Sequence, residues 1–211
     1  SDLEDFLLPT LGNDDEPAGA RVDGQMPVPS DQSMGEAIAD PLSDLGTLKD
    51  DDHFMNLAMQ QADLAAKNGE VPVGAILVAE DGFTVLSEAH NLVASNNDPT
   101  AHAEIIAIRE ACQRVENWRL NGATLYCTLE PCAMCLSAVQ SARVRRLVYG
   151  APDLRMGAVC SRLNLLEHDH PFHPHMLVEG GIQQNASASM LREFFRRRRR
   201  ETQEQRAQGW E

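Results

Sequence analysis

Two short stretches, thirty residues apart, constrain this chain more than any other feature of its sequence. Residues 100–104 read Thr-Ala-His-Ala-Glu, and residues 129–135 read Leu-Glu-Pro-Cys-Ala-Met-Cys. Together they supply one imidazole, two thiols and one carboxylate. Three nitrogen and sulfur ligands are typical of a zinc site that keeps its fourth position open for water, and such a site is usually catalytic. The expected ligands are His102, Cys132 and Cys135, and the expected proton carrier is Glu104.

The C-x-x-C pair alone is also compatible with a redox dithiol or a closed structural zinc site. A redox dithiol has no need of His102 or Glu104, and Pro131 precedes the pair rather than lying within it. A closed zinc site requires a fourth protein ligand, for which Cys127 and Cys160 are the candidates. We favour the open site because the full constellation occurs at the starts of two expected helices, each of which follows a turn.

Hydrophobic periodicity and turn residues predict alternating helices and strands. Strands are expected over residues 71–78, 83–89, 123–128, 145–149 and 176–178. Helices are expected over residues 51–68, 101–115 and 185–200, with a further helix that carries Cys132 and Cys135. Asp51 or Asp52 is expected to cap the first helix, and Asn68-Gly69 is expected to end it. Such alternation indicates an α/β layer fold with a mostly covered sheet.

Charge is distributed unevenly along the 211 residues, whose net charge is −14. Residues 1–50 hold 12 acidic and two basic side chains, whereas residues 192–211 hold four acidic and seven basic ones. The first segment is also rich in proline and poor in apolar residues, which predicts a disordered extension. We interpret it as a solvated arm rather than a regulatory one. Residues 51–201 are then the folded domain, including a basic C-terminal helix, and residues 202–211 are a tail.

Cysteine use and hydropathy indicate the compartment. Five cysteines, an odd number that includes a C-x-x-C pair, favour reduced thiols and metal over a disulfide framework. No apolar run reaches the length of a membrane span, and the N-terminus lacks the order of a signal peptide. We therefore expect a cytoplasmic protein with no membrane partner.

Four histidines cluster with prolines late in the chain, at His168, His170, His173 and His175. Histidine-rich tracts can bind metal, so a second metal site is one interpretation. Proline-rich spacing of this kind is more often found in a loop that lines a pocket or packs on a neighbour. We favour the loop.

From about residue 52 to 201 the chain resembles the bacterial (TadA-like) tRNA-specific adenosine deaminases of the zinc-dependent cytidine deaminase superfamily. The H-x-E and P-C-x-x-C pair is specific for the superfamily. The remaining resemblance lies in residues 70–75, Asn91, 98–104, 128–135, 150–153 and 192–199.

The resemblance implies a three-layer αβα sandwich around a five-stranded mixed sheet, assembled as a homodimer with one Zn²⁺ per chain. It implies hydrolytic deamination of adenosine to inosine at the wobble position of a tRNA anticodon stem-loop, with Glu104 as the proton carrier. The residues that it places against the substrate are Asn91, Val73, Ala103, Leu129, Asp153, Phe194 and Phe195.

Two features depart from this pattern. Pro152 stands where many relatives carry Arg, and the chain is acidic although RNA binding draws on Lys and Arg. The arginines at 196–200, next to Phe194 and Phe195, offset the second departure by providing charge and stacking surfaces. The alternatives are a deaminase of a free base or nucleoside, of the guanine or cytosine type, and a catalytically silent RNA-binding subunit. The presence of Glu104 argues against the silent subunit.

Overall fold

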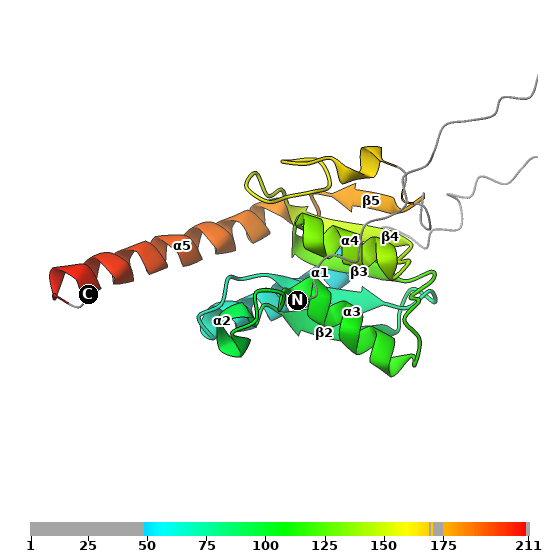
Figure 1. Ribbon diagram of the computed structural model, residues 1–211, viewed down its shortest axis with the longest axis horizontal. Coiled ribbons are helices and arrows are strands. Elements are labelled where there is room, and N and C mark those ends of the chain that lie inside the picture. The colour runs from blue at the N-terminus through cyan, green and yellow to red at the C-terminus, as the bar shows by residue number, and fades with distance from the viewer. Residues whose placement is uncertain (1–48, 169, 171–174, 210–211) are drawn as a thin grey trace, which may run out of the picture. The chain divides into compact units, whose positions relative to one another are not determined.

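The computed structural model describes residues 49–168, 170 and 175–209, all within one compact unit that spans Pro41–Glu211. Five strands form a single mixed sheet (Figure 1) in the order β2-β1-β3-β4-β5. The central strand β3 pairs antiparallel with β1 and parallel with β4. The bounds are β1 Gly74–Val78, β2 Val85–His90, β3 Thr124–Leu129, β4 Arg146–Ala151 and β5 Leu177–Gly180.

Helices cover both faces of this sheet. In Figure 1, α3 and α4 lie side by side on one face, whereas α1 lies on the other. The helices are α1 Lys49–Lys67, α2 Val93–Asn96, α3 Ala103–Arg114, α4 Ala133–Ser141 and α5 Gln184–Ala207, and the 3₁₀ turn η1 is Leu165–Glu167. The predicted αβα sandwich with a five-stranded mixed sheet is therefore confirmed.

Strand alternation divides the apolar side chains between two cores. Ala75 and Leu77 of β1 face α3 and α4, whereas Ile76 packs with α1 residues such as Met55. All five residues of β1 are buried, as the almost continuous apolar run predicts for a strand covered on both sides. The sheet is thus a rigid support for the loops at its edges.

The first helix starts earlier than the sequence predicted, and neither expected capping residue begins it. Helix α1 begins at Lys49, so Asp51 lies within its first turn. There the Asp51 carboxylate is buried and accepts hydrogen bonds from Arg146 and from the Tyr126 hydroxyl. This tertiary ion pair, which the local sequence does not reveal, explains why an acidic residue is placed at a covered position. Gly69, with φ of 79°, follows the helix as expected.

The last helix is longer than predicted and continues to Ala207, past the expected domain boundary at residue 201. Residues 201–208 contain no glycine or proline, and Glu201 pairs with Arg197 one turn earlier. Gly209, with φ of 78°, follows the end of the helix. Two short elements, α2 and η1, were not predicted because each is only three or four residues long.

The predicted disordered extension falls almost wholly on residues 1–48, outside the described residues. The histidine loop lies partly outside them too, because residues 169 and 171–174 are not described. Within the described part of the chain, no helix has the length and hydropathy needed to cross a membrane.

Candidate active site

The site lies where α3 and α4 begin, and each of these helices starts with an expected metal ligand. His102 is the N-cap residue of α3, and Cys132 is the N-cap residue of α4. Neither side chain caps its own helix by a hydrogen bond. Both are therefore free to point at a common ligand, and the unsatisfied N–H groups of the helix starts favour negative charge there.

The expected ligand atoms come together from stretches that are distant in sequence. His102 Nδ1 lies 3.8 Å from Cys132 Sγ and 3.5 Å from Cys135 Sγ, and the two sulfur atoms are 3.6 Å apart. Tetrahedral zinc, with bonds of about 2.3 Å to sulfur and about 2.0 Å to nitrogen, requires sulfur–sulfur and sulfur–nitrogen separations of about 3.8 and 3.5 Å. The three residues therefore fit a zinc ion without rearrangement.

The protonation of Cys132 also suits a metal ligand. Its hydrogen bond with the Cys135 thiol is the main influence that lowers the pKa of Cys132 to about 4, with burial opposing and His102 assisting. A cysteine binds metal as the thiolate, and the lowered pKa of Cys132 favours that form.

A fourth protein ligand is absent from this group among the described residues. The thiol of Cys127 faces the carbonyl oxygen of Val148 in the sheet, and Cys160 Sγ lies 3.3 Å from the hydroxyl of Tyr149. The arrangement is that of an open site with three protein ligands, the type associated with catalysis rather than with structure.

Glu104 occupies the second position of α3 and is 4% exposed. Its Oε2 atom is buried and has no hydrogen-bond partner within the described structure. Burial is the largest influence on the carboxyl group and raises the pKa of Glu104, with the charge of His102 acting in the opposite direction. A buried carboxyl group with an unsatisfied oxygen, two residues from a metal ligand, is equipped to accept and release a proton.

The side chain of Asn91 accepts a hydrogen bond at the start of α3, a role that the sequence did not suggest. Its Oδ1 accepts a hydrogen bond from the backbone N–H of Ala103 at 2.9 Å. The backbone N–H of Asn91 donates to the carbonyl oxygen of Val73. Oδ1 thus already accepts one hydrogen bond, and the amide nitrogen offers two N–H donors for a contact with a substrate.

The other expected substrate residues differ in their exposure. Leu129 ends β3 and is half-buried. The Asp153 carboxylate accepts hydrogen bonds from the backbone N–H groups of Arg155 and Met156, so it shapes its own loop. Phe194 is only 5% exposed, whereas Phe195 is 36% exposed. Of the two phenylalanines, Phe195 alone offers an open ring.

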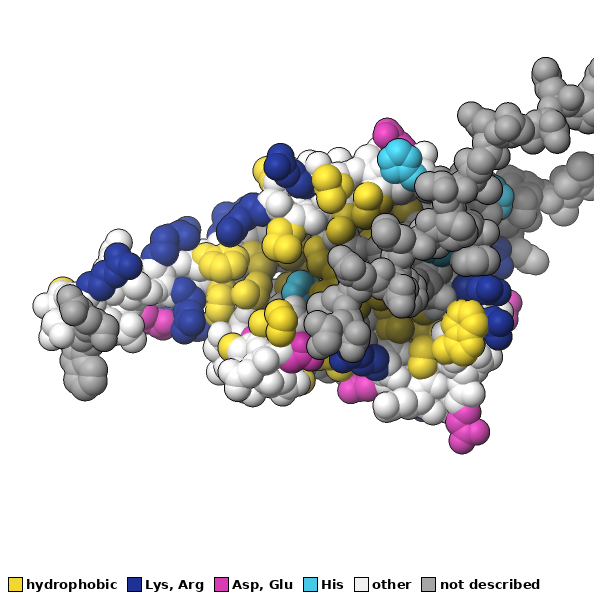
Figure 2. Space-filling view, viewed as in Figure 1, with side chains coloured by type: hydrophobic (Ala, Val, Ile, Leu, Met, Phe, Trp, Pro, Cys, Tyr) yellow, Lys and Arg dark blue, Asp and Glu magenta, His cyan; other side chains and the backbone are white. Residues whose placement is uncertain are grey.

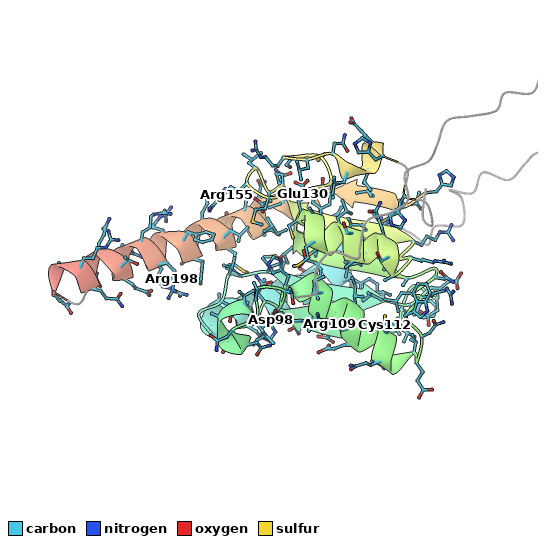
Figure 3. The ribbon with its side chains drawn as sticks, in the orientation of Figure 1. Asp98, Arg109, Cys112, Glu130, Arg155 and Arg198 are labelled. Carbon is cyan, nitrogen blue, oxygen red and sulfur yellow. The ribbon has the colours of Figure 1, made fainter. Side chains whose placement is uncertain are left out.

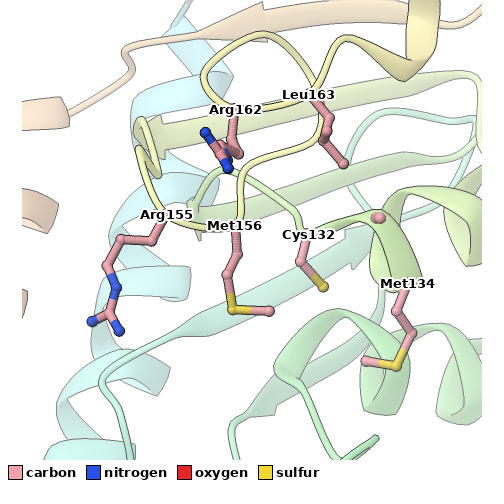
Figure 4. A pocket seen from close by; sticks show the side chains of 7 residues that line it. Cys132, Met134, Arg155, Met156, Arg162 and Leu163 are labelled. Atoms are coloured by element: carbon pink, nitrogen blue, oxygen red, sulfur yellow. The ribbon is translucent and has the colours of Figure 1, made fainter.

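A pocket of about 330 Å³ opens beside Cys132. Figure 4 shows the side chains of Cys132, Met134 and Met156 pointing toward one another within it. The remaining lining residues are Ala133, Arg155, Arg162 and Leu163. Apart from Cys132, none of these side chains was singled out from the sequence, because their approach depends on how the loop after β4 folds back.

Sequence reasoning also missed Glu130, which it assigned only to a turn. The Glu130 side chain is 2% exposed and faces the loop after β4 (Figure 3). Its carboxylate accepts four hydrogen bonds, from the backbone N–H groups of Asp153, Val159, Cys160 and Ser161. The one available signal was an acidic residue set between a buried strand and Pro131, where a solvated side chain is not expected.

Comparison with known proteins agrees with this geometry. The sequence family described as cytidine and deoxycytidylate deaminase zinc-binding region matches residues 48–151, which include all three candidate ligands and Glu104. A tRNA-specific adenosine deaminase of Haemophilus influenzae is 42% identical over 151 residues, covering 72% of this chain and 86% of that protein. Its counterpart in Agrobacterium fabrum is 46% identical over 147 residues, covering 70% and 95%.

Among solved structures, the fold is similar to one from a study of A-to-I editing by tRNA:A34 deaminases at the wobble position of transfer RNA. The two chains share 46% sequence identity with a TM-score of 0.62, over 66% of this chain and 99% of that one. The similarity therefore extends over almost the whole of that solved chain, rather than over the ligand motifs alone.

Proposed function

Because the chain belongs to the family of tRNA-specific adenosine deaminases, we propose that it converts adenosine to inosine at the wobble position of a tRNA anticodon loop. The reaction is a hydrolysis, in which water replaces the amino group at C6 of adenine and ammonia leaves. The observation that carries the proposal is the open group of His102, Cys132 and Cys135 next to the buried carboxyl group of Glu104.

A zinc ion held by these three residues, one per chain, supplies a Lewis acid that makes water a nucleophile near neutral pH. Glu104 accepts a proton from the attacking water. The same carboxyl group delivers this proton to N1 of the adenine ring, then takes the proton of the hydroxyl group newly bonded to C6 and passes it to the amino group, which leaves as ammonia. Its raised pKa suits both steps, because a carboxyl group that titrates nearer to neutral pH both takes up and gives back a proton readily.

The walls of the site provide the means to hold the base. We assign the amide nitrogen of Asn91 to an edge of the base or its sugar, since Oδ1 is used by α3. Val73 and Leu129 form apolar walls, and Ala103 leaves room at the start of α3. Asp153 shapes the loop that approaches the nucleotide backbone.

A basic surface on α5 supports an RNA substrate. Figure 2 shows Lys and Arg side chains following one another along this helix. A groove of about 270 Å³ along α5 is lined by Phe195 and by Arg198, Arg199 and Arg206. An exposed aromatic ring among guanidinium groups offers stacking to an unpaired base and charge to its phosphates. A small-molecule deaminase has no need of such a surface.

We also assign the chain to a homodimer. Four large apolar side chains lie exposed on the loop after β4 and on the neighbouring helix α4. They are Leu154 (77%), Met156 (58%) and Leu163 (46%) in the loop and Met134 (36%) in the helix. A second copy of the chain would remove this surface from water. The oligomeric state in solution, measured by sedimentation equilibrium, tests the assignment.

We also propose a compartment and a domain organisation for the chain. All five cysteines are free, which supports a reducing compartment and hence the cytoplasm. We propose residues 51–201 as the deaminase domain, preceded by the acidic extension 1–50 and followed by residues 202–211, the first six of which continue α5.

The sharpest test removes the basic surface while keeping the core. Deletion of residues 192–211 would also remove the buried Phe194, so a truncation that begins at Arg198 is preferable. We expect this truncated protein to keep its zinc but to lose activity on an anticodon stem-loop. If the full chain deaminates free guanine or cytidine and the truncated protein does so equally well, the protein is a deaminase of free bases or nucleosides.

A further inference from the structure

We propose that Glu130 is a positioning residue that holds the loop after β4, which carries the expected substrate residue Asp153, against the metal centre. Its carboxylate reaches across to both ends of the segment 153–161. One oxygen, Oε2, accepts from the N–H of Asp153 at 3.0 Å. The other, Oε1, accepts from the N–H groups of Val159, Cys160 and Ser161 at 3.0, 2.8 and 3.0 Å.

The segment that Glu130 holds carries the pocket residues Arg155 and Met156. Glu130 itself is two positions from Cys132, at the start of α4. One side chain therefore links the metal-binding helix to the opposite wall of the pocket. Figure 3 labels Glu130 and Arg155, and Arg155 lies in the loop that follows β4.

Close packing at Gly157 shows how tightly the loop is held. A Cβ atom added at Gly157 would lie 2.5 Å from Glu130 Cδ and 2.6 Å from the carbonyl oxygen of Asp153. Gly157 also forms an isolated β-bridge with Cys132, and the N–H of Ala158 donates to the carbonyl oxygen of Pro131. The loop is thus seated directly on the residues that lead into α4.

The expected metal ligands have anchors other than the Glu130 carboxylate. His102 is held by α3, and the carbonyl oxygen of Cys132 accepts the N–H of Leu136 within α4. Loss of the Glu130 charge should therefore release the loop without releasing zinc. Substrate affinity should fall, while the proton transfers of Glu104 should continue.

The test uses the zinc-loaded full chain with Glu130→Gln, which keeps the size of the side chain. Its amide group cannot accept from Asp153 and from the three later N–H groups together. We expect one zinc per chain, faster hydrogen exchange at the amides of Asp153, Val159, Cys160 and Ser161, and an unchanged amide at Leu136. For an anticodon stem-loop we expect KM to rise about tenfold while kcat stays within about twofold, as for the loss of one charge-assisted contact.

Two further variants separate positioning from general destabilisation. Gly157→Ala keeps the Glu130 carboxylate but presses a methyl group against it and against the carbonyl oxygen of Asp153, so it should displace the loop and reproduce the exchange pattern and the higher KM. Asp51→Asn removes another buried carboxylate, whose partners Arg146 and Tyr126 do not line the pocket. It should leave both the loop amides and KM unchanged.

Three results would overturn the role of Glu130. The first is full protection of the four loop amides in Glu130→Gln. The second is loss of zinc, or a lower kcat at unchanged KM, in the same variant. The third is faster exchange of these amides in Asp51→Asn. The inference rests on the proposed function only for its substrate. If the wild-type protein fails to act on the stem-loop, the proposed function fails, and amide exchange with zinc content still decides whether Glu130 holds the loop.

Discussion

The side-chain oxygen of Asn91 accepts a hydrogen bond from the backbone N–H of Ala103 at 2.9 Å, between the proposed metal ligand His102 and the proposed proton carrier Glu104. The second strand and the first turn of α3 are thereby connected at the site. Asn91 has two expected tasks, because its oxygen positions the helix and its amide nitrogen is left for the base.

Substitutions at Asn91 should separate these tasks. Asn91→Ala leaves a buried N–H without an acceptor and should lower the free energy of unfolding by about 1–3 kcal/mol, with loss of turnover. Asn91→Asp keeps the acceptor, so it should retain most of the stability and yet lose turnover. Thermal unfolding and single-turnover deamination measure the two effects. Equal stability losses in both variants would show that the contact with Ala103 contributes little.

Glu104→Gln should fold, bind one zinc per chain and lose nearly all turnover. Removal of a general acid–base group costs about 10²–10⁴-fold in rate. Its Tm should be no lower than that of the wild type, because the variant replaces a buried carboxylate oxygen that has no partner in the described structure. Substantial residual deamination, measured as inosine formed per hour, would assign the proton transfers to another group.

Cys132→Ala should lose zinc and part of the protein's stability, because metal binding is coupled to folding. Elemental analysis and thermal unfolding with and without a chelator provide the measurements. Cys112→Ala is the matched control, since its partly buried thiol lies outside the ligand group and should leave zinc content unchanged. One zinc per chain in Cys132→Ala would require a different ligand set.

The Asp51–Arg146 ion pair should make the free energy of unfolding depend on pH in the acidic range. Burial alone would raise the pKa of Asp51, but the hydrogen bonds from Arg146 and Tyr126 lower it overall. A carboxyl group whose pKa is lower in the folded state stabilises the protein above its unfolded pKa of about 3.9. This contribution is lost as the pH falls through the folded pKa.

Asp51→Asn should therefore lower the free energy of unfolding at pH 7 by about 2 kcal/mol, with Glu179 remaining as a partner of Arg146. The variant should also lose less stability than the wild type between pH 5 and 3, as urea unfolding at each pH can show. Asp63→Asn, which removes an exposed pair with Lys67, is the control and should change neither value. A parallel pH dependence in Asp51→Asn and wild type would refute the linkage.

Arg198→Ala should weaken stem-loop binding and reduce the slope of log K against log salt by about one unit if the guanidinium contacts one phosphate. Arg145→Ala removes an equal charge from an exposed position at the start of β4, and it should leave the slope unchanged. Fluorescence anisotropy over a salt series gives both slopes. Identical slopes for the two variants would show that the change in salt dependence comes from net charge rather than from a contact made by α5.

The sequence was sufficient to predict the five strands, the helices α3 and α4, and the residues at the start of each. These features depend on local periodicity and on motifs whose members lie within a few positions of one another, such as Cys132 and Cys135. The prediction that His102 lies close to the two cysteines followed from the ability of all three side chains to bind one zinc ion.

Other features depend on contacts between distant parts of the chain, and they could not be predicted. Glu130 reads as a turn residue until the loop after β4 returns to it. Asp51 reads as a helix cap until Arg146, 95 residues later, pairs with it. Met156 and Arg162 reach the pocket only through the fold of the same loop, which has little periodicity.

The central claim is that this chain deaminates adenosine within an anticodon loop. The most direct measurement incubates the zinc-loaded protein with an anticodon stem-loop that carries adenosine at the wobble position, followed by mass analysis of each nucleotide. Free adenosine, guanine and cytidine are treated in parallel. We predict inosine at the wobble position and no change in the free compounds. Turnover of a free base with an unmodified stem-loop would contradict the account.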